Sequence, residues 1–292
     1  MNTIEGKNII IIGGAGFIGS HLCEKLSSNN KIISLDNYLS GSKKNHISGV
    51  EYIEGSSKDI SKLIKNFSPD FIFHLGEYSR VESSFDDYEL VIENNLLPFS
   101  KVLVFAKEHN AKLIYSGSST KFAKYSGDEI HSPYAWVKSK NTEHLINYAE
   151  WFSLEYAIVY FYNAYGGNEI ESGIYSTLIG IYKRLYREGV RELPVVEPGT
   201  QLRNFTHYSD IVNGLEAVAI NGHGDGFGIG SDKSVSILDV VKFFGSSHKI
   251  IPSRRGNRKT ADLVTENTKA LGWSAKVDIE EHINEFIKNL KW

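Results

Sequence analysis

Apolar residues occur in short unbroken runs, and stretches with helical spacing separate these runs. The clearest such run covers residues 9–12, and mostly apolar stretches that also suit strands cover 31–35, 71–75, 112–115 and 156–161, with a shorter one at 51–54. Unbroken apolar runs of four to six residues are typical of parallel strands that are covered on both faces. Helical patterns lie between them, a short one at 59–67 and a long one at 87–109. Strands that alternate with helices predict an α/β fold of the Rossmann type, a doubly wound parallel sheet that binds ligands at the carboxyl ends of its strands.

Glycines follow the first apolar run directly, in the stretch NIIIIGGAGFIGS. Gly13 would allow a tight turn, Gly16 would let the backbone approach a pyrophosphate, and Gly19 would let the next helix pack against its strand. That helix begins near Phe17 and Ile18, and its free N–H groups would face the phosphates. A plain βα turn can also be rich in glycine, but the legible strand and helix on either side favour a dinucleotide site.

Asp36 ends the second apolar run, about twenty residues beyond the glycines. A carboxylate at this point would hold a ribose hydroxyl and repel a 2′-phosphate. Asp36 could also simply begin the turn DNYLSGS. Because its position and its chemistry agree, we favour the ribose role and therefore NAD over NADP as the cofactor.

A second group of polar residues lies further along. The strand at 112–115 runs into a serine-rich stretch at 116–120, and Ser132 and Pro133 then suit the start of a helix. Tyr134 and Lys138 would lie four residues apart on one face of that helix. A lysine ammonium beside a tyrosine favours the phenolate, which could take a proton from a sugar hydroxyl during oxidation of the same carbon. Such pairs also occur by chance on ordinary helix faces, but here the pair follows a nucleotide cradle.

Bulk properties narrow the possibilities. The chain has 292 residues and a formal charge of −3, which suits one large domain with a smaller lobe and argues against a nucleic-acid binder. Its single cysteine, Cys23, excludes an intrachain disulfide. Apolar runs are too short for a membrane span, and the N-terminus lacks the hydrophobic core of a signal peptide. We therefore expect a cytoplasmic protein with no membrane association and no metal site.

These motifs resemble the extended short-chain dehydrogenase/reductase family, specifically its NAD-dependent nucleotide-sugar epimerases and dehydratases, typified by UDP-glucose 4-epimerase. The resemblance implies NAD as cofactor and a nucleotide-diphosphate sugar as substrate. It assigns catalysis to Ser118, Tyr134 and Lys138. The cofactor-binding residues that it implies are Gly13, Gly16, Phe17, Ile18, Gly19, Asp36, Asn37, Leu75, Gly76, Asn95, Tyr134 and Lys138. The substrate-binding residues that it implies are Thr120, Asn163, Arg203, Arg254 and Arg255.

Four residues depart from the pattern of that family. Glu77 replaces a small residue near the cofactor, and Asn204 replaces an aspartate after Arg203. Ser56 and Ser57 stand where an Asp-Ile pair usually meets the adenine, which leaves the adenine contacts open. Arg254, Arg255 and Arg258 suit a diphosphate site, although three arginines in one loop can also serve solubility.

The resemblance also predicts how the chain is divided. Residues 1–165 would form the NAD-binding domain, to which segments such as 203–220 return, and residues 166–292 would form most of a discontinuous substrate-binding lobe. Further predicted elements are helices at 174–188, 208–219 and 236–244 and strands at 194–196 and 227–231. The helices at 87–109 and 134–152 carry apolar residues that permit a homodimer, although a buried core helix would look the same.

Several activities fit these residues. A 4-epimerase in bacterial surface-polysaccharide synthesis is the first expectation, and a C4 dehydrogenase that releases a 4-keto sugar, for example of a GDP-heptose, needs the same residues. A 4,6-dehydratase is less favoured, because the run Ser118 to Lys121 lacks the acidic pair of that class. A non-catalytic NAD-binding regulator would not need Tyr134 and Lys138.

Overall fold

A seven-stranded parallel sheet forms the centre of the molecule. The computed structural model describes residues 3–122, 132–253 and 262–290. The sheet has the order β11-β6-β5-β4-β1-β2-β3, and every neighbouring pair is parallel. Its strands are β1 (Asn8–Ile12), β2 (Lys31–Asp36), β3 (Val50–Glu54), β4 (Phe71–His74), β5 (Lys112–Ser116), β6 (Tyr156–Phe161) and β11 (Gly224–Ile229). The predicted doubly wound α/β fold is therefore confirmed.

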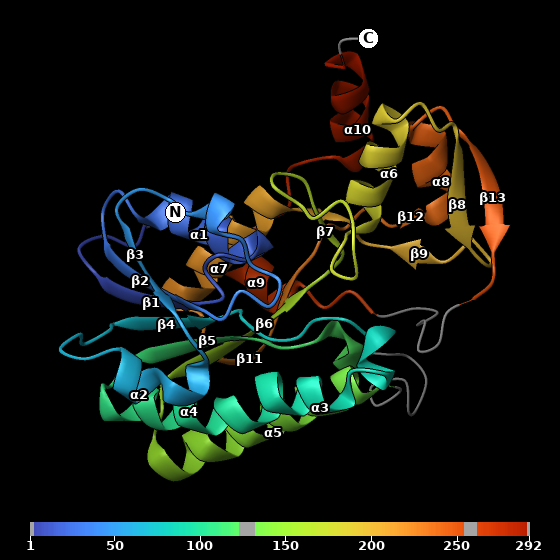
Figure 1. Cartoon of the computed structure of the whole chain (residues 1–292). Coiled ribbons are helices and arrows are strands. Elements are labelled where there is room, and N and C mark those ends of the chain that lie inside the picture. The colour runs from blue at the N-terminus through green and yellow to red at the C-terminus, as the bar shows by residue number, and fades with distance from the viewer. Residues whose placement is uncertain (1–2, 123–131, 254–261, 291–292) are drawn as a thin grey trace.

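Helices cover both faces of this sheet (Figure 1). One face carries α1 (Phe17–Leu26), α7 (Tyr208–Asn221) and α9 (Glu266–Ala270), and the other carries α2 (Ile60–Leu63), α4 (Leu97–Glu108) and α5 (Pro133–Phe152). Apolar side chains of α1 and α7, such as Leu22 and Leu215, join one core cluster. Phe99 and Leu145 of α4 and α5 join the other. Since both faces are covered, most residues of the central strands β1, β4, β5 and β6 are buried, whereas the edge strand β3 has no buried residue.

Two predicted helices differ from the observed ones. The pattern at 59–67 yields only α2, because the backbone becomes extended at Ile64, with φ −106° and ψ 102°, and Asn66 then adopts a left-handed conformation with φ 57°. The pattern at 87–109 is divided into α3 (Tyr88–Val91), a π-helix η4 (Ile92–Leu96) and α4. Pro98 cannot donate a hydrogen bond to the preceding turn, and the helix widens to a π-helix just before it.

A smaller lobe stands at one end of the sheet (Figure 1). It contains α6 (Leu178–Arg187), α8 (Ile237–Phe243), α10 (Ile279–Lys288) and a parallel pair of strands, β8 (Glu192–Val196) and β13 (Ser247–Ile251). Tyr182, Phe244 and Ile283 lie in its core. The predicted helix at 174–188 begins only at Leu178, because the Thr177 side chain caps it by accepting a hydrogen bond from the Gly180 N–H at 2.9 Å.

Short elements complete the structure. Two small strand pairs join β7 (Ala164–Tyr165) to β10 (Thr206–His207) and β9 (Leu202–Arg203) to β12 (Val235–Ser236). Single 3₁₀ turns occur at η1 (Lys43–Asn45), η2 (Ser57–Asp59), η3 (Ser83–Phe85) and η5 (Ser119–Phe122). After its first passage through the lobe the chain returns to the sheet as α7 and β11, so the lobe is built from discontinuous segments.

Candidate active site

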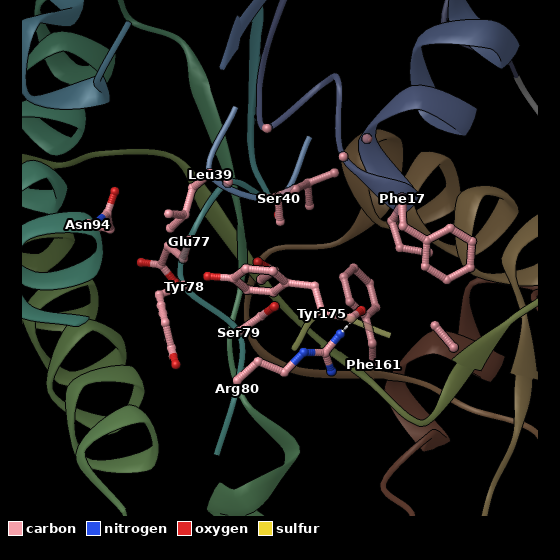
Figure 2. A pocket seen from close by; sticks show the side chains of 18 of the residues that line it. Phe17, Leu39, Ser40, Glu77, Tyr78, Ser79, Arg80, Asn94, Phe161 and Tyr175 are labelled. Atoms are coloured by element: carbon pink, nitrogen blue, oxygen red, sulfur yellow. Dashed lines mark hydrogen bonds between the residues drawn. The ribbon is translucent and has the colours of Figure 1, made fainter. Parts of the chain in front are cut away.

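A cavity of about 430 Å³ opens at the carboxyl ends of the central strands, which is within the usual range for small-molecule sites. Its wall combines the ends of β1, β2, β4, β5 and β6 with residues that lead into the smaller lobe, such as Tyr175 and Thr177 (Figure 2). The predicted site residues that line it are Gly13, Gly16, Phe17, Ile18, Gly19, Asp36, Asn37, Leu75, Gly76, Ser118, Tyr134, Lys138 and Asn163.

The glycine turn after β1 leaves no room for side chains. Gly13 has φ 86°, which strains any other residue. A Cβ at Gly19 would lie 2.0 Å from the Gly13 carbonyl oxygen, and one at Gly76, after β4, would lie 2.7 Å from the Gly13 nitrogen. Gly16 directly precedes α1, so the first N–H groups of that helix open at this turn. The turn is a backbone cradle that fits the pyrophosphate of a dinucleotide.

Asp36 is held rigidly at the end of β2. Its carboxylate accepts hydrogen bonds from the backbone N–H groups of Ala15 at 2.9 Å and Tyr38 at 2.8 Å. Burial raises the pKa of Asp36, and these two hydrogen bonds oppose that rise. The neighbouring Asn37 side chain donates to Asn94 across the cavity wall at 2.7 Å. A fixed carboxylate at this point fits a ribose diol and disfavours a phosphate.

The start of α5 places Tyr134 and Lys138. The Ser132 hydroxyl accepts a hydrogen bond from the Ala135 N–H at 3.1 Å, and Pro133 is the first helical residue, so the predicted helix start is confirmed. One turn later the buried Lys138 ammonium donates to the carbonyl of Ser116 at the end of β5, at 2.6 Å. Tyr134 and Lys138 both line the cavity.

Ser118 lies just beyond β5, also in the cavity wall. Its hydroxyl oxygen accepts a hydrogen bond from the Thr120 hydroxyl at 2.9 Å and a weaker one from the Thr120 N–H at 3.3 Å. Thr120 does not line the cavity but contacts Ser118, which does. The arrangement leaves the hydrogen of the Ser118 hydroxyl available to an oxygen in the cavity.

Some expected site residues lie elsewhere. Asn95 is fully buried behind the wall, where its amide bonds both the N–H and the carbonyl of Tyr78. It therefore supports the loop after β4 rather than lining the cavity. Arg203 lies in β9 and donates to the Leu202 carbonyl at 2.8 Å, also away from the cavity wall. Arg254 and Arg255 lie outside the described residues.

Sequence reasoning did not explain Glu77, which the structure places beside Lys138. The Glu77 side chain is only 1% exposed and forms an ion pair with the Lys138 ammonium. It also accepts hydrogen bonds from the Asn141 amide at 3.0 Å and the Tyr115 hydroxyl at 3.3 Å. Burial and the nearby Glu77 carboxylate raise the pKa of Tyr115, which stays protonated as a donor. The sequence does carry a signal of this role, because Glu77 replaces the small residue that the family usually has in this loop at the end of a strand.

Arg80 and Tyr175 were missed altogether. Figure 2 shows the Arg80 side chain reaching toward Tyr175, whose main-chain carbonyl accepts a hydrogen bond from it. The Arg80 Nε and the Tyr175 hydroxyl are buried without a hydrogen-bond partner in the described structure. Burial lowers the pKa of Arg80, and the phenol groups of Tyr134, Tyr175 and Tyr78 oppose that effect. The place of Arg80 in the loop after β4 could have identified it, since such loops line ligand sites in this fold.

The described residues show neither a cluster of metal ligands nor a membrane-spanning helix. They contain no group of three or more His, Cys, Asp or Glu side chains that could hold a metal ion. None of their helices is both long enough and apolar enough to cross a membrane.

Comparison with known proteins identifies the family of this chain. The model of the NAD dependent epimerase/dehydratase family matches residues 9–230. The chain is 27% identical to a putative UDP-glucose 4-epimerase of Methanocaldococcus jannaschii over 97% of this chain and 98% of that one. It resembles the structure of a UDP-N-acetylglucosamine 4-epimerase from Methanobrevibacter ruminantium, in complex with UDP-N-acetylmuramic acid, with TM-score 0.88, 23% identity and 98% of both chains covered.

A further similar structure contains the cofactor. It is the complex of Thermus thermophilus UDP-glucose 4-epimerase with NAD, with TM-score 0.84, 22% identity and coverage of 97% of this chain and 99% of that one. These structures share the fold, and the family match extends over most of the chain, including the glycine turn, Asp36 and the Tyr134–Lys138 pair. This protein therefore belongs to the NAD-dependent epimerase/dehydratase family, and it is an enzyme whose cofactor is NAD.

Proposed function

We propose that this enzyme oxidises carbon 4 of a nucleotide-diphosphate sugar and acts as a 4-epimerase. The observation that carries the proposal is that Ser118, Tyr134 and Lys138 line the same cavity as the glycine turn and Asp36. A base, a hydroxyl donor and a dinucleotide cradle in one cavity suit the reversible oxidation of a secondary alcohol. Relatives named as 4-epimerases over nearly the whole length of the chain also support it.

The residues divide the work as follows. The Tyr134 oxygen accepts the proton of the sugar's 4-hydroxyl as the carbon–oxygen double bond forms, and Ser118 donates a hydrogen bond to that oxygen. NAD, when bound, would supply the acceptor and then the donor of the hydride at carbon 4. If the keto sugar presents its opposite face before it is reduced, Tyr134 returns the proton to the same oxygen and the product is the epimer. The hydride and the proton that are removed in the oxidation are both returned in the reduction, so no further reactant is required.

Two features of the cavity would hold NAD, one at its pyrophosphate and one at its adenosine ribose. The glycine turn at Gly13, Gly16 and Gly19 would bind the pyrophosphate, and Asp36 the adenosine ribose. Ser56 and Ser57 also line the cavity, which makes them available for contacts with the adenine. Lys138 still has one ammonium hydrogen beyond its contacts with Ser116 and Glu77, and this hydrogen suits the ribose next to the nicotinamide.

The substrate's diphosphate would lie toward the smaller lobe. Asn163 lines the cavity there with φ 34°, an unusual backbone conformation that often occurs at functional positions. We propose Asn163 as a diphosphate ligand in the cavity wall, Arg203 of β9 as a ligand from beyond that wall, Arg254 and Arg255 as further ligands, and Thr120 as a support for Ser118 near the sugar. Guanidinium groups suit diphosphates because they can form paired, charge-assisted hydrogen bonds.

A dehydratase fits less well. Elimination of water needs an acid beside the sugar, yet Ser119 and Thr120 occupy the stretch where that class carries its acidic pair. Lys121 follows, and its ammonium forms an ion pair with Asp225. Glu77, the acid that lies near Lys138, is committed to its three donors. These contacts favour a reaction in which the sugar keeps all its oxygens.

A C4 dehydrogenase that releases the keto sugar, for example from a GDP-heptose, uses the same residues and is the alternative. A panel of UDP-, GDP- and dTDP-sugars with the pure enzyme and NAD decides between them. A product alcohol with NAD restored indicates an epimerase, and accumulated NADH indicates a dehydrogenase. Absence of any turnover across the panel would overturn the proposed function in favour of a non-catalytic regulator.

The cellular setting and assembly follow from the same proposal. We place the enzyme in the cytoplasm, in the synthesis of sugars for bacterial surface polysaccharides. We also propose a homodimer through α4 and α5, because Leu97, Trp151 and Phe152 on these helices are at least half exposed. Large exposed apolar side chains on neighbouring helices suit a helix-to-helix interface. Sedimentation of the enzyme beside a Trp151→Glu variant tests this assembly: a monomeric wild-type enzyme contradicts it.

A further inference from the structure

A buried carboxylate holds the proposed catalytic lysine. Glu77 follows β4, the neighbour of β5 in the sheet, and its side chain meets Lys138 from α5. Both side chains are almost fully buried, 1% and 4% exposed, so solvent screens their interaction little. Tyr115 and Asn141 complete the donors around the carboxylate. Buried carboxylates need such partners, and this one has them from β5 and α5.

We propose that Glu77 is a positioning residue that fixes the Lys138 ammonium and cancels most of its charge at Tyr134, so that Arg80 supplies the cation that favours the Tyr134 phenolate. The inference rests on the proposed function, because it takes Tyr134 as the base. It assigns a new division of labour within the same cavity. Lys138 contributes its geometry and its hydrogen bonds, while Arg80 contributes the net charge.

The hydrogen bonds of Lys138 explain the positioning. An ammonium has three hydrogens, and two of them point at Glu77 and at the Ser116 carbonyl. These two contacts, from different strand ends, fix the direction of the third hydrogen. Without the Glu77 carboxylate, the long lysine side chain would keep only its hydrogen bond to the Ser116 carbonyl and its contact with the Tyr115 ring, whose centroid is 4.9 Å from the ammonium nitrogen.

The charged and titratable groups around the pair support the charge cancellation. Burial lowers the pKa of His74, at the end of β4, to about 4, so this imidazole is neutral at physiological pH. Tyr115 on β5 is also neutral, because burial and Glu77 raise its pKa. Lys138 and Glu77 then contribute one charge each, of opposite sign and in contact. From Tyr134, the pair acts as a dipole rather than as a cation.

Arg80 has no such partner. Among the described residues no carboxylate forms an ion pair with its guanidinium, which meets the Tyr175 carbonyl and lies 5.6 Å from the Tyr175 ring centroid. Arg80 lines the same cavity as Tyr134 and interacts electrostatically with its phenol group. A phenolate at Tyr134 would therefore find an uncompensated cation at Arg80.

The test is a pH titration of Tyr134 itself, followed by the ultraviolet absorption of tyrosinate. Each variant is compared with the same variant carrying Tyr134→Phe, so that the difference reports this one residue. In Glu77→Gln the lysine charge is uncancelled, and the midpoint should move about one pH unit toward acid. In Arg80→Gln it should move by a similar amount toward alkali. The pH profile of single-turnover oxidation should shift with each midpoint.

Glu216→Gln provides the matched control. Glu216 is also a buried glutamate with a lysine partner, Lys25 at 3.1 Å, but it lies on α7 and does not line the cavity. In Glu216→Gln the midpoint of the Tyr134 titration should match that of the wild-type protein. An unchanged or alkaline midpoint in Glu77→Gln would overturn the proposal, and so would an unchanged midpoint in Arg80→Gln. If Glu77→Gln does not fold, the Arg80→Gln result decides alone.

This outcome is separate from the fate of the proposed function. The titration needs neither substrate nor cofactor, so it gives a result even if the sugar panel shows no turnover. Conversely, turnover in the panel with unshifted midpoints would retain the proposed function and reject the role of Glu77.

Discussion

Replacing Lys138 by methionine should destabilise the fold as well as abolish catalysis. The substitution removes the ammonium and leaves the Glu77 carboxylate buried with only Tyr115 and Asn141 as donors. Removing one partner of a buried ion pair costs about 3–5 kcal/mol. Two hydrogen bonds remain to Glu77, so we expect the lower end, about 3 kcal/mol of the free energy of unfolding. For a protein of this size that corresponds to a fall of roughly 6–12 °C in melting temperature.

Thermal unfolding followed by circular dichroism measures this loss in Lys138→Met, Glu77→Gln and the double variant. Because the amide of glutamine removes the stranded charge, the double variant should regain at least half of the stability that Lys138→Met loses, with a coupling of about 1–3 kcal/mol. Its oxidation rate should stay as low as that of Lys138→Met. A melting temperature for Lys138→Met within about 2 °C of the wild-type value would refute the reasoning, since it would mean that Glu77 does not depend on Lys138.

Three further results are expected. If Asp36 holds the ribose, NAD should bind far more tightly than NADP, and Asp36→Ala should reduce this difference in affinity. Titration of both cofactors by intrinsic fluorescence measures it, and equal affinities in the unmutated enzyme would exclude the assignment. Arg203→Ala should raise the dissociation constant of a nucleoside diphosphate roughly tenfold to a hundredfold, because it removes one charge-assisted hydrogen bond of about 1.5–3 kcal/mol. NAD binding, measured by calorimetry in the same variant, should be unchanged. Equal weakening of both ligands would make Arg203 structural. Gly19→Ala should abolish NAD binding, because its Cβ would lie 2.0 Å from the Gly13 carbonyl oxygen, and normal NAD affinity would contradict the cradle.

The strands and the cofactor end of the site could be predicted because short-range patterns determine them. Apolar runs such as Ile9 to Ile12 are buried on both faces, and the glycines after them adopt a turn that other residues cannot. The start of α5 could also be predicted, since the serine cap and the first-turn proline that determine it lie next to each other in the sequence. Each of these features depends on neighbours in the sequence.

The charges of the site depend on contacts that the sequence does not reveal. Glu77 meets Lys138 from an element 61 positions away in the chain, and Arg80 meets Tyr175 at a separation of 95 residues. The spacing of residues along the sequence does not predict either of these long-range contacts. Asn95 shows the same limit, because it bonds the Tyr78 backbone rather than facing the cavity. The π-helix before Pro98 rotates the residues around it away from simple helical spacing.

The central claim is that Tyr134 is the base of a sugar oxidation. It is tested most directly by single-turnover formation of NADH with Tyr134→Phe and with the wild-type enzyme, using a nucleotide sugar that the panel identifies as a substrate. Loss of a general base lowers such a rate by at least about two orders of magnitude. We expect that loss together with unchanged NAD affinity and melting temperature. A rate for Tyr134→Phe close to that of the wild-type enzyme would contradict the account.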